Sequence, residues 1–208
     1  MALRPDLVIG APFRTRAAIA PLGLPPAAIV DLPMQNDVAG IARAIATVAA
    51  AIGHPERGRR LVAAMRADLA AIGPPPGRGR IAAYYQRQGY LTGTGTLVDD
   101  LMARVGLVNL ARRLGRPALS TLSLEEMALA RPAFLVMEAD TRIAVDRGTA
   151  ALHHPVLDAA VPAARRLYIP QALTVCGGPA YARAVAMLAA QVRAADRRGP
   201  VRPVRTTP

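Results

Sequence analysis

Short apolar runs alternate with longer amphipathic segments along most of the chain, and each run is bounded by glycine or proline. Runs of this length and composition predict buried strands. They occur at residues 7–10, 28–32, 81–85, 133–137 and 167–169. Between them, helical segments are predicted, most with apolar residues at 3.6-residue spacing. They occupy residues 14–22, 38–52 and 55–72, and begin again near Thr96, Leu124 and Pro179. This alternation predicts an α/β fold with mainly parallel sheets.

Helix ends carry signals of their own. Asn36 or Asp37 can cap the helix that follows, and Pro55 suits the first turn of the next one. The Gly-Pro-Pro-Pro-Gly run at residues 73–77 stops that helix. Residues 123–126 have the form of a capping box, with serine at the N-cap and glutamate three residues later. These signals place helix boundaries independently of the apolar spacing.

The segment after the predicted strand 81–85 carries the most informative polar residues. Gln86, Tyr90 and the Gly/Thr-rich loop Thr92–Thr96 come at the carboxyl end of that strand and lead into a helix. In open α/β sheets, ligands bind at this edge. The helix would offer free backbone N–H groups and the positive end of its dipole. The segment therefore predicts a binding edge, with no catalytic group beside it.

The same loop departs from the known nucleotide-binding patterns. It lacks the Lys-Ser/Thr pair of a P-loop, and Val98 occupies the third glycine position of G-x-G-x-x-G. A small Rossmann-like nucleotide-dependent enzyme using this loop is an alternative from a different functional class. Against it, the chain shows no acid/base pair with a nucleophile. We therefore expect no enzyme activity.

Composition narrows the choice of partners. With 52% hydrophobic and 19% charged residues, the chain is not disordered in general. The formal net charge is +12, and because lysine is absent, all 26 basic residues are arginine. A basic balance often indicates nucleic acid or an anionic membrane. Here the arginines are scattered, and only 3% of residues are aromatic, which leaves few stacking platforms for single strands. We expect no nucleic-acid partner.

Cysteine and histidine usage bounds the chemistry further. The single cysteine, Cys176, excludes an internal disulfide and a cysteine-based zinc site. His153 and His154 would point in different directions on a helix, and His54 is the only other histidine, so no metal site is expected. No apolar stretch of 18 or more residues predicts a membrane span. No signal-peptide pattern follows Met1, which at face value predicts a cytoplasmic polypeptide.

Several motifs occur in an order that points to one family. Residues 95–97 read Gly-Thr-Leu, residues 99–101 Asp-Asp-Leu, and residues 105–111 Val-Gly-Leu-Val-Asn-Leu-Ala. Further matches are Leu-Arg-Pro-Asp-Leu-Val-Ile at 3–9, Leu-Glu-Glu at 124–126 through Arg-Pro at 131–132, His-Pro at 154–155 and Cys-Gly-Gly-Pro at 176–179. Together these segments resemble the helical-backbone periplasmic binding proteins, the substrate receptors of ABC importers for ferric siderophores, haem and cobalamin.

The resemblance implies a fold of two Rossmann-like lobes with mainly parallel sheets, joined by a long spine helix. We accordingly expect a partial N-terminal lobe at residues 1–53, the spine helix at 54–73, a C-terminal lobe at 74–196 and a disordered tail at 197–208. The first lobe is expected to be incomplete, because the motif at residues 3–9 lies well inside that lobe in the family. A misassigned start or a fragment would each explain this, so an inactive fragment is a further alternative.

The resemblance also implies the function. The chain would be the substrate-binding component of an ABC-type importer, binding an iron–siderophore or cobalamin-like chelate without catalysis and without a cofactor. A periplasmic location, a monomeric state and an ABC permease dimer as partner follow from the same resemblance. Related receptors dock through one acidic residue on each lobe. Near residues 174–180, where the second would fall, the chain has no aspartate or glutamate, so the docking acids are not found here.

Candidate ligand contacts follow from the sheet edges and the resemblance. One of Tyr84 and Tyr85 should pack in the core, because neighbours on a strand point opposite ways. Tyrosine hydroxyls donate to carboxylate or catecholate oxygens, and arginine pairs with an anionic siderophore through its planar fork. Glu138, Asp140 and Thr141 hold the corresponding place after the strand 133–137. The residues assigned to the ligand are Phe13, Arg14, Tyr85, Gln86, Tyr90, Thr92, Thr94, Asp140, Thr174 and Cys176.

Overall fold

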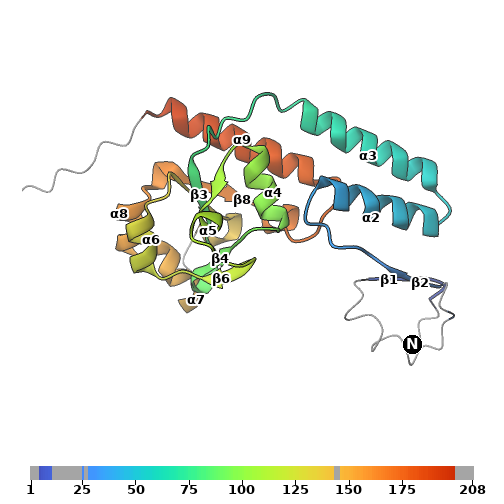
Figure 1. Cartoon of the computed structure of the whole chain (residues 1–208), viewed down its shortest axis with the longest axis horizontal. Helices are drawn as coiled ribbons and strands as arrows, with labels where there is room; N and C mark the ends of the chain where they lie inside the picture. Colours follow the sequence, from blue (N-terminus) through green and yellow to red (C-terminus); the bar gives the residue numbers. More distant parts are fainter. Residues whose placement is uncertain (1–4, 11–24, 26–27, 143–145, 200–208) are drawn as a thin grey trace, which may run out of the picture.

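The computed structural model describes residues 5–10, 25, 28–142 and 146–199 of the chain (Figure 1). The helix predicted at residues 14–22 lies outside these ranges. The strands are β1 (Val8–Gly10), β2 (Ile29–Asp31), β3 (Ile81–Tyr84), β4 (Tyr90–Thr92), β5 (Val108–Asn109), β6 (Leu119–Thr121), β7 (Phe134–Glu138) and β8 (Arg166–Ile169). Every strand predicted from an apolar run is present, with its ends within one residue of the predicted bounds.

The described strands form three sheets. The central sheet is entirely parallel, in the order β5-β3-β7-β8. Strands β1 and β2 pair in parallel in a small separate sheet, and β4 and β6 form an antiparallel ribbon. The predicted α/β fold with mainly parallel pairing is confirmed. The ribbon is not predicted by the apolar pattern, because its strands are too short to show an alternation.

The α-helices follow the predicted order with short additions. They are α2 (Val38–Ala51), α3 (Pro55–Ala70), α4 (Leu97–Arg104), α5 (Leu110–Arg113), α6 (Leu124–Ala130), α7 (Arg147–Ala150), α8 (Pro155–Ala160) and α9 (Tyr181–Arg197). Short 3-10 turns are η3 (Arg87–Gly89), η4 (Ala139–Arg142), η5 (Ala151–His153), η6 (Ala163–Arg165) and η7 (Gln171–Leu173). The predicted caps hold: Asp37 accepts a hydrogen bond from Gly40 N (2.6 Å), and Ser123 forms a capping box with Glu126.

Helices cover both faces of the central sheet and create two apolar cores. One core contains Tyr84 and is packed mainly by α4 and α9, with Met65 of α3 buried against it. The other contains Tyr85 and is packed by α5, α6 and α8. Because β3 contributes side chains to both cores in turn, the two tyrosines lie on opposite faces of the sheet.

Helix α3 joins the N-terminal elements to the central sheet. Strands β1 and β2 lie at the far end of the molecule from that sheet, and α2 and α3 run side by side (Figure 1). Gly58 permits this close packing, because a Cβ at this position would lie 2.5 Å from the Ala49 Cβ. Beyond the other end of α3, Arg193 of α9 donates to the carbonyl oxygens of Ile72 (2.9 Å) and Pro74 (3.0 Å). Residues 55–70 therefore form one continuous helix that is held near both ends.

The lobe boundaries at residues 53 and 74 stay predictions. At the C-terminus, α9 continues through Arg197, the first residue that composition assigned to the tail. No helix within the described ranges is both long and apolar enough to cross a membrane.

Candidate functional site

A cavity of about 430 Å³ opens where the carboxyl ends of β3 and β7 meet the segment before α2. Parallel strands bring their carboxyl ends to one edge of a sheet, so this is where the topology gathers polar side chains. The central-sheet side of the wall includes Tyr84, Gln86, Thr92, Thr96, Glu138, Gln171 and Thr174, and the other side is formed by Met34, Gln35 and Asn36. The cavity therefore lies between the segment that precedes α2 and the central sheet.

A chain of oriented hydrogen bonds runs along the cavity wall. Thr92 Oγ1 donates to Gln86 Oε1 (2.9 Å), and Gln86 Nε2 donates to Glu138 Oε1 (2.8 Å). Glu138 is only 4% exposed although it carries a carboxyl group. Because Gln86 is held from both sides, its amide is fixed with the nitrogen towards Glu138. The chain of hydrogen bonds therefore ends on Glu138, the buried acid among the described wall residues.

Tyr84 contributes a hydroxyl group from the end of β3. Its oxygen lies 3.5 Å from Thr174 Oγ1, and Thr174 Oγ1 donates to the Gln171 carbonyl oxygen (3.2 Å). Burial raises the pKa of Tyr84 to about 12, and the charges of Glu138 and Asp140 act in the same direction, while Thr174 opposes them. Tyr84 therefore keeps its proton at neutral pH, and the wall remains polar there without a further charge.

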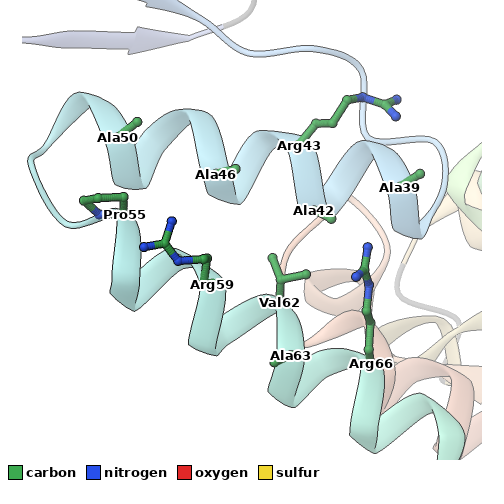
Figure 2. Close-up of a pocket in the computed structure, with 11 residues that line it drawn as sticks. Ala39, Ala42, Arg43, Ala46, Ala50, Pro55, Arg59, Val62, Ala63 and Arg66 are labelled. Atoms are coloured by element: carbon green, nitrogen blue, oxygen red, sulfur yellow. The ribbon is translucent and has the colours of Figure 1, made fainter.

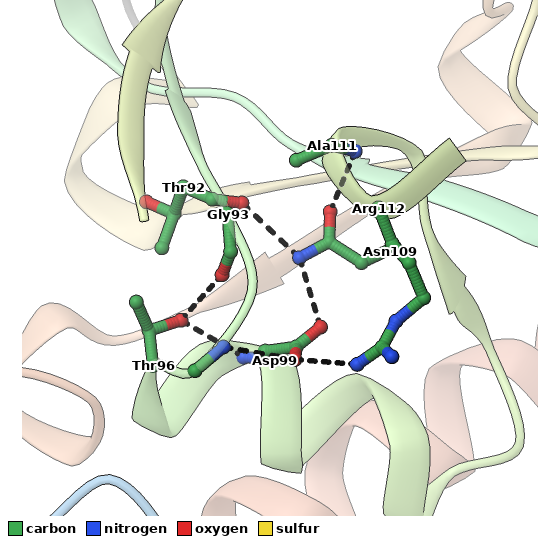
Figure 3. A network of polar contacts seen from close by, with 8 residues as sticks. Thr92, Gly93, Thr96, Asp99, Asn109, Ala111 and Arg112 are labelled. Atoms are coloured by element: carbon green, nitrogen blue, oxygen red, sulfur yellow. Dashed lines mark hydrogen bonds and ion pairs between the residues drawn. The ribbon is translucent and has the colours of Figure 1, made fainter. Parts of the chain in front are cut away.

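The Gly/Thr-rich loop is organised by protein groups (Figure 3). Thr96 caps α4: its Oγ1 accepts from Asp99 N (3.2 Å) and donates to the Gly93 carbonyl oxygen (2.8 Å). The buried Asp99 carboxylate accepts three further bonds, and its donors are Gly95 N (3.2 Å), Asn109 Nδ2 (3.1 Å) and Arg112 Nη2 (3.0 Å). Asn109 Nδ2 also donates to the Thr92 carbonyl oxygen (3.2 Å), which ties the loop to β5.

This network bears on one expectation about the binding edge, that the start of α4 offers free backbone N–H groups to a ligand. The N–H groups of Gly95 and Asp99 donate within the protein, and the Asp99 carboxylate meets the positive end of the helix dipole. For Leu97 and Val98, which line the cavity, the expectation stays a prediction. The motif residues at 95–101 and 109 therefore hold the loop in shape. They form the scaffold of the cavity edge.

The structure brings together some of the residues assigned from the sequence. Gln86, Thr92 and Thr174 line the cavity. Tyr85 is buried in the opposite core, where its hydroxyl donates to the Leu122 carbonyl oxygen (2.7 Å). The alternation along β3 thus gives the cavity position to Tyr84, and we assign it there.

Three of the other assigned residues, Tyr90, Thr94 and Asp140, are not among the described residues that line this cavity. Tyr90 is exposed on β4, Thr94 is half-buried in the loop, and Asp140 is exposed in η4. Phe13 and Arg14 lie outside the described residues. Two other wall residues, Gln35 and Asn36, were not assigned to the ligand from the sequence. Their only sequence feature that indicates a ligand contact is their position after a strand, so their place in the wall is seen only from the packing.

Two other hollows flank α2 and α3. A groove of about 430 Å³ between α2, α3 and residues 176–179 is largely apolar and includes Cys176. It shares Gln35 and Gly177 with the polar cavity, and the contact between them is tight, because a Cβ on Gly177 would lie 2.2 Å from Gln35 Cβ. A larger groove of about 680 Å³, lined mainly by small side chains and arginines of α2 and α3, is shown in Figure 2. No described residue lining either groove is an aspartate or glutamate.

Among the described residues, no group of three or more histidine, cysteine, aspartate or glutamate side chains is placed to hold a metal ion.

Comparison with known proteins gives a consistent result. The sequence profile described as "Periplasmic binding protein" matches residues 1–152. The periplasmic heme-binding protein RhuT from Roseiflexus sp. RS-1 is similar at 27% identity and a TM-score of 0.72, over 92% of this chain and 77% of that one. No curated protein sequence matches the chain.

Two further solved structures share the fold at lower identity. An ABC-type Fe3+-hydroxamate transport system protein from Saccharomonospora viridis has 20% identity and a TM-score of 0.71, over 90% of this chain and 69% of that one. The vitamin B12 binding protein BtuF of Vibrio cholerae has 16% identity and a TM-score of 0.64, over 94% of this chain and 76% of that one.

Proposed function

Because this chain belongs to the periplasmic binding protein family, we propose that it binds an iron–siderophore or cobalamin-like metal chelate in the polar cavity at the ends of β3 and β7. It serves as a substrate-binding component for ABC-type import and is not an enzyme. The family is periplasmic, which is the location that we assign to the chain. An ABC permease dimer is the partner that this role requires.

The cavity itself is the observation that carries the proposal. Its wall is built from the ends of two strands of one rigid sheet and from Gln35 and Asn36 on the opposite side. A ligand in it would touch both the N-terminal elements and the central sheet, as an interlobe ligand does. The similar protein at 27% identity is named as heme-binding, and haem is a metal chelate, which supports the ligand class.

The ligand contacts that we propose are Tyr84, Gln86, Thr92, Glu138 and Thr174. Arg14 and Phe13 stay predictions for the N-terminal side of the cleft, and the lobe division at residues 53 and 74 is proposed in the same sense. Helix α3 would then connect two lobes as a stiff element, since residues 55–70 form one helix.

Direct titration tests the function. We would titrate the chain with a ferric trihydroxamate, haem, cyanocobalamin and NADH, following chelate absorbance and the fluorescence of the five tyrosines, which no tryptophan obscures. We expect saturable binding of at least one chelate and none of the dinucleotide. A saturable response to NADH alone would favour the nucleotide-dependent enzyme instead.

Adjacent tyrosines provide a matched pair of variants. Tyr84→Phe removes a hydroxyl from the cavity wall, so we expect chelate affinity to fall about fivefold, the effect of one hydrogen bond. Tyr85→Phe removes the bond to Leu122 in the opposite core, so it should cost about 1 kcal/mol of stability and leave affinity unchanged. If Tyr85→Phe weakened binding and Tyr84→Phe did not, the cavity would be the wrong site.

A further inference from the structure

The threonine hydroxyls on the cavity wall all use their protons within the protein. Each of the three donates to another protein group, and the acceptors are Gln86 Oε1 for Thr92 (2.9 Å), the Gly93 carbonyl oxygen for Thr96 (2.8 Å) and the Gln171 carbonyl oxygen for Thr174 (3.2 Å). A hydroxyl group has one proton and two lone pairs. These groups therefore meet a ligand as hydrogen-bond acceptors.

Tyr84 follows the same direction. In the 3.5 Å contact between the Tyr84 and Thr174 hydroxyl groups either oxygen can be the donor, and Tyr84 is the donor when Thr174 gives its proton to the Gln171 carbonyl oxygen. Its pKa of about 12 keeps the hydroxyl neutral, so it adds lone pairs without a negative charge. The hydroxyl groups of the wall can thus act as hydrogen-bond acceptors towards a ligand through their oxygen lone pairs.

Glu138 adds a full negative charge to this acceptor-rich wall. Within the described part of the chain, its carboxylate shows one hydrogen bond, from Gln86 Nε2 to Oε1. A carboxylate can accept about four such bonds, and a charge withdrawn from water is costly unless it is partnered. Glu138 is 4% exposed and lines the cavity, so a ligand there would replace the water beside the carboxylate.

No described residue of the cavity wall is an arginine, lysine or histidine. This stands out in a chain with 26 basic residues and a net charge of +12. The arginines that give the protein its positive charge are therefore not among the described wall residues, and the charged side chain among them is that of Glu138.

We propose that the Glu138 end of the cavity binds a positively charged, N–H-bearing group of the ligand, so that the chain prefers an ammonium-bearing chelate to the same chelate with that group neutralised. This inference rests on the proposed function, since it assumes that a chelate occupies the cavity. An ammonium supplies three N–H donors and the opposite charge. It would pair with the carboxylate while the neighbouring hydroxyl oxygens accept its other protons.

The test compares two ligands that differ at one group. The ferric complex of desferrioxamine B carries a free ammonium group, and its N-acetyl derivative keeps the same iron centre without that charge. We would measure both dissociation constants by titration calorimetry and include haem and cyanocobalamin. A charge-assisted hydrogen bond to a buried carboxylate predicts about 10- to 100-fold weaker binding of the acetylated complex.

Variants then locate the effect. Glu138→Gln removes the charge but keeps an oxygen that can accept from Gln86, so the preference for the ammonium form should fall to about one. Glu125→Gln makes the same change at an exposed position on α6 and should leave the preference intact. Thermal melts of both variants show whether each is folded, and the comparison of the two ligands on the unmodified chain needs no variant.

The outcomes separate the inference from the proposed function. Equal binding of the two complexes, or binding of haem without the ammonium form, would overturn the charge selection and leave the chelate-binding role standing. A preference that survives in Glu138→Gln would also overturn it. If no chelate in the panel binds saturably, the proposed function fails first and takes the inference with it.

Discussion

Replacing Asp99 with alanine should destabilise the edge of the cavity. Asp99 is 8% exposed, and its carboxylate accepts bonds from Gly95 N, Asn109 Nδ2 and Arg112 Nη2. The substitution removes the two acceptor oxygens of all three hydrogen bonds, together with the negative charge at the start of α4. The bond from Asn109 to the Thr92 carbonyl oxygen would still tie the Gly/Thr-rich loop to β5.

The magnitude follows from the exposure of each partner. Asn109 is 2% exposed and loses one of its two acceptors, which costs about 1 kcal/mol. The side chain of Arg112 is 63% exposed and returns to water, so its share is about 0.5 kcal/mol. The helix dipole contributes about 0.5 kcal/mol more. We therefore expect a loss of about 2 kcal/mol, which lowers the melting temperature by about 4–8 °C in a chain of this size.

Urea and thermal denaturation, followed by circular dichroism, measure this change. The control is Asp68→Ala, the same substitution at an exposed position on α3, which should change stability by less than about 0.5 kcal/mol. A loss in Asp99→Ala no larger than that of Asp68→Ala would show that the network of Figure 3 contributes nothing to stability. The interpretation of the 95–109 motif as a scaffold would then be wrong.

Three further predictions concern packing, pH and capping. Gly177→Ala should lower stability by about 1–3 kcal/mol in a thermal melt, because the new Cβ would lie 2.2 Å from Gln35 Cβ. At Gly178 a Cβ would meet open space, so Gly178→Ala should be tolerated. Equal melting temperatures of the two variants would refute the close contact. The bond from Arg80 lowers the pKa of Asp196 in the folded protein. Asp196 therefore stabilises the fold at any pH above its unfolded-state pKa of about 3.9, and this contribution is lost as the pH falls through its lower, folded-state pKa. The unfolding free energy of Asp196→Asn should accordingly fall less steeply than that of the unmodified chain between about pH 5 and pH 2, and parallel curves would contradict this. Ser123→Ala removes the N-cap of α6 and should cost about 1 kcal/mol in urea denaturation, so an unchanged midpoint would count against the cap.

Local patterns in the sequence were sufficient for β3, β7 and β8 of the central sheet and for several helix ends, but not for the two-residue strand β5. Strand β3 and the Thr96 cap of α4 appear where the apolar run and the loop predicted them. The capping box at Ser123 needs only residues within one turn. Each of these features depends on neighbours in the chain, which is why one sequence is enough to predict it. The edge at which polar residues gather follows from the order of strands in the same way.

The sequence also supplied the family resemblance, and the profile match over residues 1–152 confirms it. Its motif residues had a role that could not be foreseen. Asp99 and Asn109 are known from the sequence only as motif residues and Gly95 as part of the predicted binding loop, and the structure shows that Gly95 and Asn109 both donate to Asp99. Residues far apart in the chain must meet before such bonds can form, so spacing alone does not distinguish scaffold from ligand contact.

Tertiary packing alone decided the face of β3 that the cavity uses. The sequence required Tyr84 and Tyr85 to point in opposite directions, but both faces of the sheet are covered by helices and both are apolar. The face on which the cavity opens depends on which distant elements pack against each side of the sheet. One such contact joins Gln86 and Glu138, which are 52 residues apart in the chain. Alternation along a strand is a local property. The side on which a cavity opens is set by the packing of distant elements, and no single segment contains that information.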